Sequence, residues 1–384
     1  MNIPFNKPYF SGDEFDLMQQ AIKIGKISGN GFFSKKCSEF FKKTSGFHSL
    51  LTSSCTDALE MSAILLDIQP GDEVIMPSYT FVSTANAFVL RGANIVFTDS
   101  RKDHPGMDED SIESLITEKT KAIVPVHYAG VACDMDKIMA IAKKHNLGVV
   151  EDAAQAIDSF YYGAAGKQPL GGIGDVSAFS FHETKNVTSG EGGMLVVNNQ
   201  AYKDRAEIIW EKGTNRAQFF RGEVDKYSWV DVGSSFLPSD ITAAFLYAQL
   251  ENLEKIQSKR VAIWNRYNEA LKDLASNEGF SLPSIPEFAT NNGHMFYLVM
   301  PTPQDRAAMI SFLKERGVHS VFHYLSLHKS TFHTEYMAKL GRPVQDLPQS
   351  DHYSNCLIRL PFFNDLTDSE QQYIIDSIYA FYQR

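Results

Sequence analysis

The sequence has few cysteines and no long hydrophobic run. Its four cysteines, Cys37, Cys55, Cys133 and Cys356, are far apart among 384 residues, and no two have the CxxC spacing. This usage is typical of a protein whose thiols stay reduced inside the cell. No segment approaches the roughly 18 apolar residues of a membrane helix. The first ten residues also lack the basic start and apolar core of a signal peptide. We therefore expect a cytoplasmic protein with no membrane partner.

Positive charge is also scarce. The chain has 36 Lys and Arg against 46 Asp and Glu, which gives a formal net charge of −10. Proteins that bind nucleic acid usually carry an excess of positive charge, so we expect no nucleic-acid partner. An anionic small substrate stays compatible with this balance, because a single site can be locally basic. No internal repeat or low-complexity tract is present, and the length allows a large core and two domains.

Between residues 49 and 197, short apolar segments alternate with helical patterns. Turn residues such as Gly71 and Gly92 separate them. This alternation predicts an α/β protein with a parallel sheet covered by helices. The expected strands are 50–52, 73–76, 94–98, 122–126, 148–150, 176–181 and 194–197, and the expected helices are 57–66, 83–91, 107–116 and 134–145.

The two ends of the chain differ from this central pattern. Ser11-Gly-Asp-Glu should start a helix with Phe15, Met18 and Ile22 as its apolar face, and a second helix should cover 32–44. Residues 240–275 predict one long helix. We place a domain boundary near Lys255, between a large domain of residues 1–254 and a smaller α+β domain of residues 255–384. The smaller domain should contain strands at 295–300, 318–321 and 357–360 and helices at 305–316 and 368–382.

One lysine lies between a strand-like run and a glycine-rich turn. Residues 177–193 read Ser-Ala-Phe-Ser-Phe-His-Glu-Thr-Lys-Asn-Val-Thr-Ser-Gly-Glu-Gly-Gly, and the lysine is Lys185. Phe179 and Phe181 precede it with a period of two, as in a strand with one apolar face. A lysine amine becomes a useful nucleophile where apolar surroundings or positive charge lower its pKa. Taken alone, such a lysine is usually a surface residue, so the neighbouring segments decide the interpretation.

Three other segments fit a cofactor site around Lys185. Asp152 ends a short apolar strand, where ligands of open α/β sheets bind, and a carboxylate there would keep a pyridinium nitrogen protonated. Residues 52–57, Thr-Ser-Ser-Cys-Thr-Asp, open a helix whose free N–H groups suit a phosphate. An ordinary N-cap is the simpler explanation of that segment alone. Phe81 supplies an aromatic ring that could stack on a flat cofactor.

Together these segments resemble the DegT/DnrJ/EryC1/StrS family of sugar aminotransferases. The resemblance runs from Ile3 to the last helix, and its most specific parts are residues 77–88, 124–133, 180–186 and 211–216. It implies a fold type I aminotransferase, with a mostly parallel sheet in the large domain, one antiparallel strand and a smaller α+β C-terminal domain. It also implies pyridoxal 5′-phosphate as cofactor, which becomes pyridoxamine 5′-phosphate during turnover.

The family pattern implies roles for individual residues. Lys185 matches the lysine that forms the Schiff base with the cofactor, Asp152 the partner of the pyridine nitrogen, and Gln155 the group beside the phenolic oxygen. The other implied cofactor residues are Cys55 and Thr56 in the phosphate loop, Ser180 as a phosphate ligand and Phe81 as the stacking ring.

Residues 233–237 depart from the family pattern. Many relatives have Gly-x-Asn-x-Arg where this chain has Gly-Ser-Ser-Phe-Leu. The asparagine of those relatives reaches the phosphate in the neighbouring subunit, so the resemblance implies a homodimer with shared active sites. Ser235 holds the position of that asparagine and would make a shorter contact. Leu237 removes the usual arginine.

Substrate contacts are expected in two further segments. Residues 213–233 predict a long loop, in which Arg216 and Arg221 would suit a diphosphate, although surface ion pairs explain them equally well. Residues 323–328 resemble the family's stretch at the sugar-binding cleft, which makes Tyr324 and His328 candidates. No third ligand has a suitable spacing from His323 and His328, so no metal is expected. The glycine-rich stretch 161–174 lacks the context of a dinucleotide fingerprint and should be a flexible loop beside the active site.

The resemblance implies that L-glutamate donates an amino group to C4 of dTDP-4-keto-6-deoxy-D-glucose. The product would be a dTDP-4-amino-4,6-dideoxyhexose, with the galacto epimer favoured, for a cell-surface polysaccharide such as O-antigen or enterobacterial common antigen. Lys185 would act as general acid and base. Sugar dehydratases of this superfamily have histidine in place of the lysine, so Lys185 favours transamination.

Three alternatives stay open at this point. The enzyme could form the gluco epimer or aminate a 3-keto sugar, and product NMR separates these outcomes. It could transfer acyl groups through the Cys55 thiol, which lies at a helix start. It could also be a regulatory protein that binds the cofactor without turnover.

Overall fold

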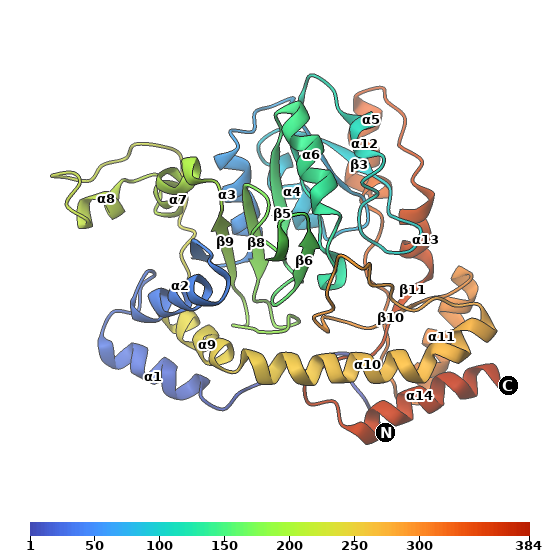
Figure 1. The fold of residues 1–384 in the computed structure, drawn as a ribbon. Helices are drawn as coiled ribbons and strands as arrows, with labels where there is room; N and C mark the ends of the chain where they lie inside the picture. The colour runs from blue at the N-terminus through green and yellow to red at the C-terminus, as the bar shows by residue number, and fades with distance from the viewer.

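The computed structural model of residues 1–384 has a central seven-stranded sheet between two layers of helices (Figure 1). In spatial order the strands are β1 (Ser49–Thr52), β9 (Gly193–Val197), β8 (Val176–Ser180), β5 (Gly148–Asp152), β4 (Thr120–Ile123), β2 (Glu73–Pro77) and β3 (Asn94–Thr98). β9 runs antiparallel to both of its neighbours, and the other strands are parallel to one another. The α/β fold with a mostly parallel sheet and one antiparallel strand is therefore confirmed.

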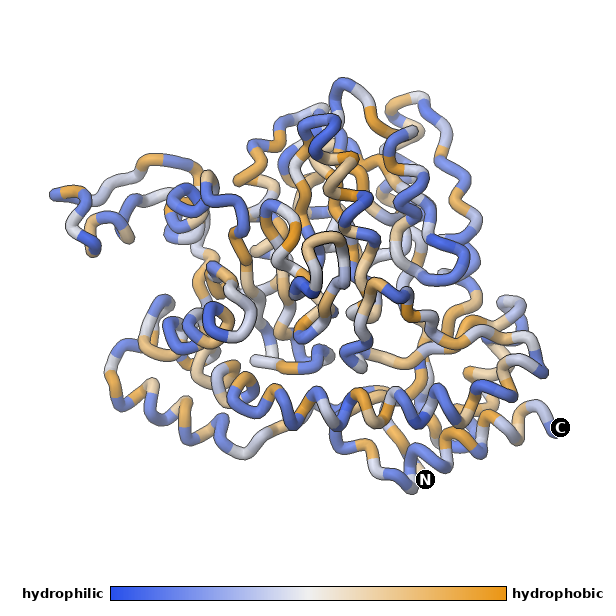
Figure 2. Tube along the Cα trace, viewed as in Figure 1, coloured by the Kyte–Doolittle hydropathy of each residue, from blue (hydrophilic) through white to orange (hydrophobic).

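Side chains alternate between two cores, one on each face of the sheet. In β5, Val149 belongs to the core beneath α2 (Phe32–Ser45), α6 (Met135–His145) and α9 (Asp240–Glu251). Its neighbour Val150 belongs to the core beneath α3 (Cys55–Leu65), α4 (Val82–Val89) and α7 (Lys203–Trp210). Because both faces are covered, the strands are apolar on both sides, as parallel sheets require. Figure 2 shows the resulting concentration of apolar residues along the central strands.

A third core lies in the C-terminal part of the chain. It joins α10 (Leu253–Glu278), α11 (Pro303–Glu315) and α14 (Asp368–Tyr382) to the short antiparallel pair β10 (Tyr297–Val299) and β11 (Leu357–Arg359). Ile3 of the N-terminal segment is buried in the same core. We propose a division at 254/255, near the start of α10, where Ile256 still packs in the core of the large sheet and Ile263 and later residues of the helix pack in the third core.

Part of the C-terminal region returns to the large sheet. The segment with α12 (Thr331–Lys339) and α13 (Pro348–Cys356) lies beside β3 (Figure 1). The Gln345 amide exchanges two hydrogen bonds with the backbone of Phe97, at 2.9 and 3.1 Å. The Asp99 carboxylate accepts bonds from the first N–H groups of α13. These contacts tie the two units together on one side of the sheet.

Three predicted elements are wrong in detail. The long helix expected over 240–275 is two helices, α9 and α10, with Asn252 between them in a non-helical conformation. Residues 318–321 form only two isolated bridges, one of them between Val318 and Ile3. Of the helix expected over 107–116, only α5 (Ile112–Leu115) forms.

The predicted apolar face of the first helix is wrong for two of its three residues, because Met18 packs against the core of the sheet but Phe15 and Ile22 do not. In α1 (Glu14–Ile24), Phe15 and Ile22 are 74% and 58% exposed, whereas Glu14 is buried against α9. The Glu14 carboxylate accepts bonds from the N–H groups of Ser11 and Gly12 and from the Gln249 amide, which makes its burial possible. The exposed side chains form an apolar surface on the outside of the chain.

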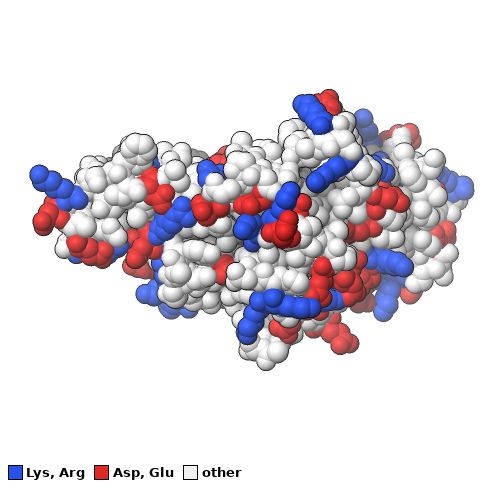
Figure 3. All heavy atoms as spheres, turned by 90° about the horizontal axis from the view of Figure 1, so that it is seen from above, with Lys and Arg blue, Asp and Glu red and all other residues white.

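Residues 212–234 form an arm that projects from the large unit, with α8 (Arg216–Phe220) near its tip (Figure 1). Phe220 and Trp229 on this arm are 70% and 80% exposed. Acidic and basic side chains are interspersed over the face drawn in Figure 3. None of the helices has the length and hydropathy of a membrane-spanning segment.

Candidate functional site

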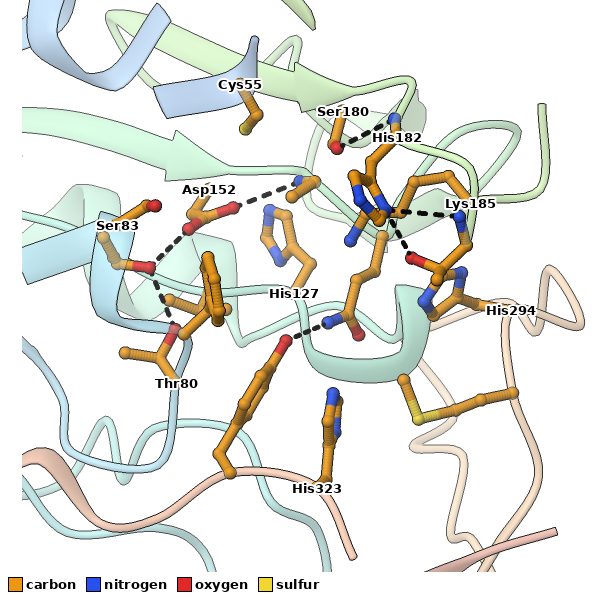
Figure 4. Close-up of a pocket in the computed structure, with 18 of the residues that line it drawn as sticks. Cys55, Thr80, Ser83, His127, Asp152, Ser180, His182, Lys185, His294 and His323 are labelled. Carbon is orange, nitrogen blue, oxygen red and sulfur yellow. Dashed lines mark hydrogen bonds between the residues drawn. The ribbon is translucent and has the colours of Figure 1, made fainter. Parts of the chain in front are cut away.

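A cavity of about 580 Å³ opens at the carboxyl ends of the central strands, between the two units. The segments that follow β2, β5 and β8 line one side, together with the start of α3. Residues 294–295, 323–324 and 359–362 line the other side, together with Phe5 and Asn6. This is the place where open α/β sheets bind ligands. Figure 4 shows the side chains that converge there.

Lys185 lies in this cavity, in the loop after β8. Its backbone N–H donates to the His182 carbonyl at 2.9 Å, which fixes the turn that carries it. Burial lowers the pKa of the Lys185 amine, and nearby Arg359 acts in the same direction, while Cys55 and Asp152 oppose the shift. An amine with a lowered pKa is more often neutral and is therefore a better base and nucleophile.

Asp152 ends β5 and lies in the same cavity, 5% exposed. Its carboxylate accepts hydrogen bonds from Thr84 Oγ1 at 2.7 Å and from the Ala154 N–H at 3.1 Å (Figure 4). Burial raises the pKa of Asp152, although the bond from Thr84 opposes this shift. Such a carboxylate gains most from a positively charged partner that enters the cavity.

The start of α3 provides a cradle for a phosphate group. Ser54 caps the helix by accepting from the Asp57 N–H at 3.1 Å, and Cys55 and Thr56 form its first turn. Gly193 of β9 passes close to this turn. A Cβ on Gly193 would lie 2.3 Å from the Ser54 carbonyl, so only glycine allows the strand to approach. Helix N-termini attract anions through their free N–H groups.

Cys55 is not activated as a nucleophile. Burial raises the pKa of its thiol well above the usual range, and nearby Asp152 raises it further. Reactive cysteines have a lowered pKa in electropositive surroundings. The alternative of acyl transfer through Cys55 therefore has no chemical basis in this site.

The side walls of the cavity hold an amide and aromatic rings. The Gln155 Oε1 accepts from the Ala129 N–H at 2.6 Å, and its Nε2 donates to the Tyr324 hydroxyl at 2.9 Å. The Phe81 ring is 56% exposed and lies 6.1 Å from the Tyr324 ring. Both Gln155 and Tyr324 are thus held in fixed orientations at the cavity wall.

These residues fit pyridoxal phosphate. The first turn of α3 and Ser180 would hold the phosphate, Asp152 would pair with the ring nitrogen, and Lys185 would supply the amine for the carbonyl carbon. The structural basis for this fit is the close approach of Gly193 to the helix start and the lack of any positively charged partner on the Asp152 carboxylate.

Three residues predicted at the site lie outside the cavity of this chain. Arg216 is exposed on the arm, and Ser235 is exposed next to the arm. His328 is 0% exposed, and its Nδ1 lies 2.7 Å from Ser78 Oγ. The expected substrate contact from His328 is thus replaced by an internal hydrogen bond.

The structure also brings residues to the cavity that sequence reasoning missed. His294 and Arg359 line it, and neither belongs to a segment that the sequence pattern singled out. His127 and His323 line it as well; they lie in the segments 124–133 and 323–328 that carried the resemblance, but no role was expected for them. His323 Nδ1 lies 2.7 Å from the Tyr128 hydroxyl. Only the long-range folding of the chain places these groups near Lys185.

Glu151, the neighbour of Asp152, fixes the glycine-rich stretch that was predicted to be flexible. That stretch forms a hairpin of β6 (Phe160–Gly163) and β7 (Gly166–Pro169) and then a loop bound to Glu151. The Glu151 carboxylate is fully buried and accepts from His127 Nε2 at 3.0 Å and from the N–H groups of Gly171, Ile173 and Gly174. Burial raises the pKa of Glu151, but the hydrogen bonds outweigh it and hold the pKa below its usual value.

We predict that Glu151→Gln destabilises the fold by about 3–5 kcal/mol, because the amide turns a donor toward groups that can only donate. Chemical denaturation would measure the loss, with Glu118→Gln on the surface as the matched control. Because folding lowers the pKa of Glu151, its contribution to stability is fully present above the pKa of the unfolded state. This contribution is lost as the pH falls through the pKa of the folded state. Equal stability of the two variants at neutral pH would contradict the role of Glu151.

The chain is similar over nearly its whole length to known proteins. Residues 10–379 match the sequence model of the DegT/DnrJ/EryC1/StrS aminotransferase family. An uncharacterized protein of Methanocaldococcus jannaschii is 33% identical over 385 residues, with 98% of this chain and 96% of that protein covered. SpsC of Bacillus subtilis, a spore coat polysaccharide biosynthesis protein, is 30% identical over 383 residues with the same coverage.

Solved structures show the same fold. A protein of Streptococcus pneumoniae assigned to the sugar aminotransferases has been solved in its PLP and PMP forms. Each form superposes with a TM-score of 0.88 at 27% identity, and the match covers 100% of this chain and 99% and 98% of the two solved chains.

Proposed function

Because the chain belongs to the DegT/DnrJ/EryC1/StrS aminotransferase family, whose cofactor is pyridoxal phosphate, we propose that it transfers an amino group from L-glutamate to C4 of dTDP-4-keto-6-deoxy-D-glucose. The observation that carries the transamination is the convergence of Lys185, Asp152 and the start of α3 in one cavity. The sugar rests on the sequence resemblance in residues 77–88 and 124–133. The relative SpsC, named for polysaccharide biosynthesis, supports a role in cell-surface polysaccharide synthesis.

When bound, the cofactor supplies an electron sink for the reacting carbon. Lys185 Nζ removes the proton from the amino-bearing carbon of glutamate in the first half-reaction. In the second half-reaction it delivers a proton to C4 of the sugar. The lowered pKa of Lys185 suits both tasks, since a group that exchanges protons works best when its pKa approaches the working pH. The Asp152 carboxylate would keep the ring nitrogen of the bound cofactor protonated and positively charged.

Arg359 is the residue we propose for the carboxylate of the amino donor. Its side chain reaches the cavity from the end of β11 and lies over the Phe5 ring at 4.6 Å. Its hydrogen bond to the protein is a long one, 3.4 Å, to the Phe322 carbonyl, and its Nε is buried without a partner. A half-buried guanidinium with free donors gains most from a carboxylate ligand.

We predict that Arg359→Leu lowers kcat/KM for glutamate roughly 10- to 100-fold, because a charge-assisted hydrogen bond contributes about 1.5–3 kcal/mol. The loss should appear mainly in KM for glutamate. Stopped-flow absorbance of the glutamate half-reaction would measure it, and Arg359→Lys should recover part of the loss. An effect confined to the sugar half-reaction would contradict the assignment.

Tyr324 and His323 are proposed to contact the sugar. They lie on the wall opposite Lys185. The Tyr324 hydroxyl accepts a hydrogen bond from the Gln155 amide, and His323 Nδ1 is hydrogen-bonded to the Tyr128 hydroxyl. The two rings also stack, with centroids 3.5 Å apart. Rigid side chains of this kind fix which face of the sugar ring meets the cofactor, and that face determines the epimer formed at C4.

We also propose a homodimer in which the projecting arm meets the partner chain. The exposed aromatic residues of the arm and the exposed Phe15 and Ile22 of α1 support this, since such side chains are usually covered in the assembled protein. Ser235 and Arg216 would then reach the partner's cavity. Light scattering coupled to size exclusion measures the assembly state, and a monomer would remove both residues from the site.

NMR of the product tests the proposed function. The purified protein would be incubated with pyridoxal phosphate, glutamate and dTDP-4-keto-6-deoxyglucose. An amino group at C4 is the expected result, and a small coupling between H3 and H4 would identify the galacto epimer. A large coupling would identify the gluco epimer. If glutamate changes the cofactor absorbance but no product forms, the aminotransferase activity is retained and this sugar is rejected as the substrate.

A further inference from the structure

A buried polar network fixes one imidazole in the cavity wall. His294 precedes β10, is 7% exposed and lines the cavity close to Lys185 (Figure 4). Its Nδ1 lies 2.7 Å from Oδ1 of Asn186, the residue that follows Lys185. The network therefore connects the catalytic loop to the C-terminal unit.

The partners of Asn186 determine which nitrogen of His294 carries the proton. The Asn186 amide nitrogen donates to the Asn292 carbonyl at 3.0 Å and to Gln257 Oε1 at 2.8 Å. The backbone carbonyl of Asn292 can only accept a hydrogen bond, so the side-chain amide nitrogen of Asn186 must face it. Asn186 Oδ1 is then the acceptor in its contact with His294, and Nδ1 of His294 carries the proton.

This arrangement leaves the other nitrogen of His294 as an acceptor. A neutral imidazole has one protonated nitrogen, so Nε2 presents a lone pair. The charged groups that face the ring are Lys185, Arg260 and Arg359, all positive. Burial and these three charges hold the pKa of His294 well below its usual value. The ring therefore stays neutral and keeps its acceptor.

Lys185 and His294 line the same cavity, and Asn186, which binds His294 Nδ1, is the next residue after Lys185. Arg260 does not line the cavity, and its guanidinium donates to the Gly293 and His294 carbonyls at 2.9 and 2.7 Å. We propose that His294 is a positioning residue whose Nε2 accepts a hydrogen bond from the Lys185 amine whenever that amine is free and protonated. This inference rests on the proposed role of Lys185 as the acid and base of the reaction.

The bond would orient the lysine between its two proton transfers. Lys185 also faces Cys55 of α3, Asp152 of β5 and Arg359 of β11. Asp152 pairs with the ring nitrogen once the cofactor is bound, which leaves His294 as a neutral acceptor for the ammonium. Since the glutamate and sugar half-reactions both use the lysine, His294 should matter equally in both.

Two substitutions separate the two ends of the imidazole. An asparagine amide takes the place of Nδ1, and a glutamine amide takes the place of Nε2. His294→Asn keeps the bond to Asn186 but loses the cavity acceptor, and it should slow both half-reactions roughly 10- to 100-fold. His294→Gln keeps an acceptor in the cavity and should recover most of the rate. Slowing of the sugar half-reaction alone would mean that His294 contacts the sugar, and would overturn the proposal.

Histidine ¹⁵N NMR of the cofactor-free protein gives a readout that does not depend on turnover. The resonance absent from whichever of His294→Gln and His294→Asn folds identifies the residue. We expect the neutral Nδ1–H form at pH 7, and an Nε2–H form or an imidazolium would overturn the proposal even if a variant fails to fold. The NMR measurement and the glutamate half-reaction do not require conversion of the dTDP sugar, so rejection of that substrate would leave these two tests intact.

Discussion

Lys185→Ala should bind pyridoxal phosphate but lose turnover by at least about 10⁴-fold, the upper range for a positioned acid–base group. The phosphate cradle at the start of α3 and the Asp152 carboxylate stay in place in this variant, so noncovalent binding should persist. The proton transfers lose their only lysine, because no other lysine lines the cavity. Activity would be measured by product formation, and binding by the absorbance of the retained cofactor.

The matched control is Lys272→Ala on the exposed face of α10, which should match the wild type. Borohydride reduction adds an independent readout. It should attach the cofactor covalently to the wild type and to the control, but not to Lys185→Ala, as intact mass spectrometry would show. Turnover by Lys185→Ala, or covalent attachment at another lysine, would reject Lys185 as the catalytic residue.

Asp152→Asn should reduce turnover about 10²- to 10³-fold, the loss typical of one preorganised electrostatic contact. The asparagine oxygen can still accept a hydrogen bond from the Ala154 N–H or from Thr84, so the local structure should survive. What it removes is the negative charge that stabilises a protonated ring nitrogen. The loss should appear in kcat for both half-reactions, since the same charge acts in each.

The same variant should have the opposite effect on stability. Burial raises the pKa of Asp152 in the cofactor-free protein, so the ionised carboxylate costs stability at any pH above the folded pKa. Asp152→Asn removes that cost, and the cofactor-free variant should unfold at the same or a higher temperature than the wild type. The stabilisation gained on adding pyridoxal phosphate should shrink. Asp273→Asn, exposed on α10, is the control, and activity near the wild-type level in Asp152→Asn would contradict its role.

The elements of the sheet could be predicted because their signal is local. β3 and α14 have the predicted bounds, and the other six strands of the large sheet lie within a few residues of them. Short apolar runs bounded by glycine and polar turns are a property of each segment by itself. The failures came where a distant segment decided the outcome, as in the burial of Glu14 by Gln249.

The sequence by itself determined the α/β class and the residues around Lys185, Asp152 and Cys55. Asp152 ends β5, Cys55 and Lys185 lie in the segments after β1 and β8, and the carboxyl ends of parallel strands meet at one edge of the sheet. Their convergence follows from chain order alone.

Only the tertiary structure decided that Arg359 and His294 face the same cavity and that His328 does not. Arg359 is 174 positions from Lys185 along the chain (359 − 185). No local pattern specifies the packing of α10 and β11 against the sheet. Side chains that far apart meet only when the cores of both units have formed, because burial of apolar surface, and not the local backbone preference, sets the placement of one unit against the other.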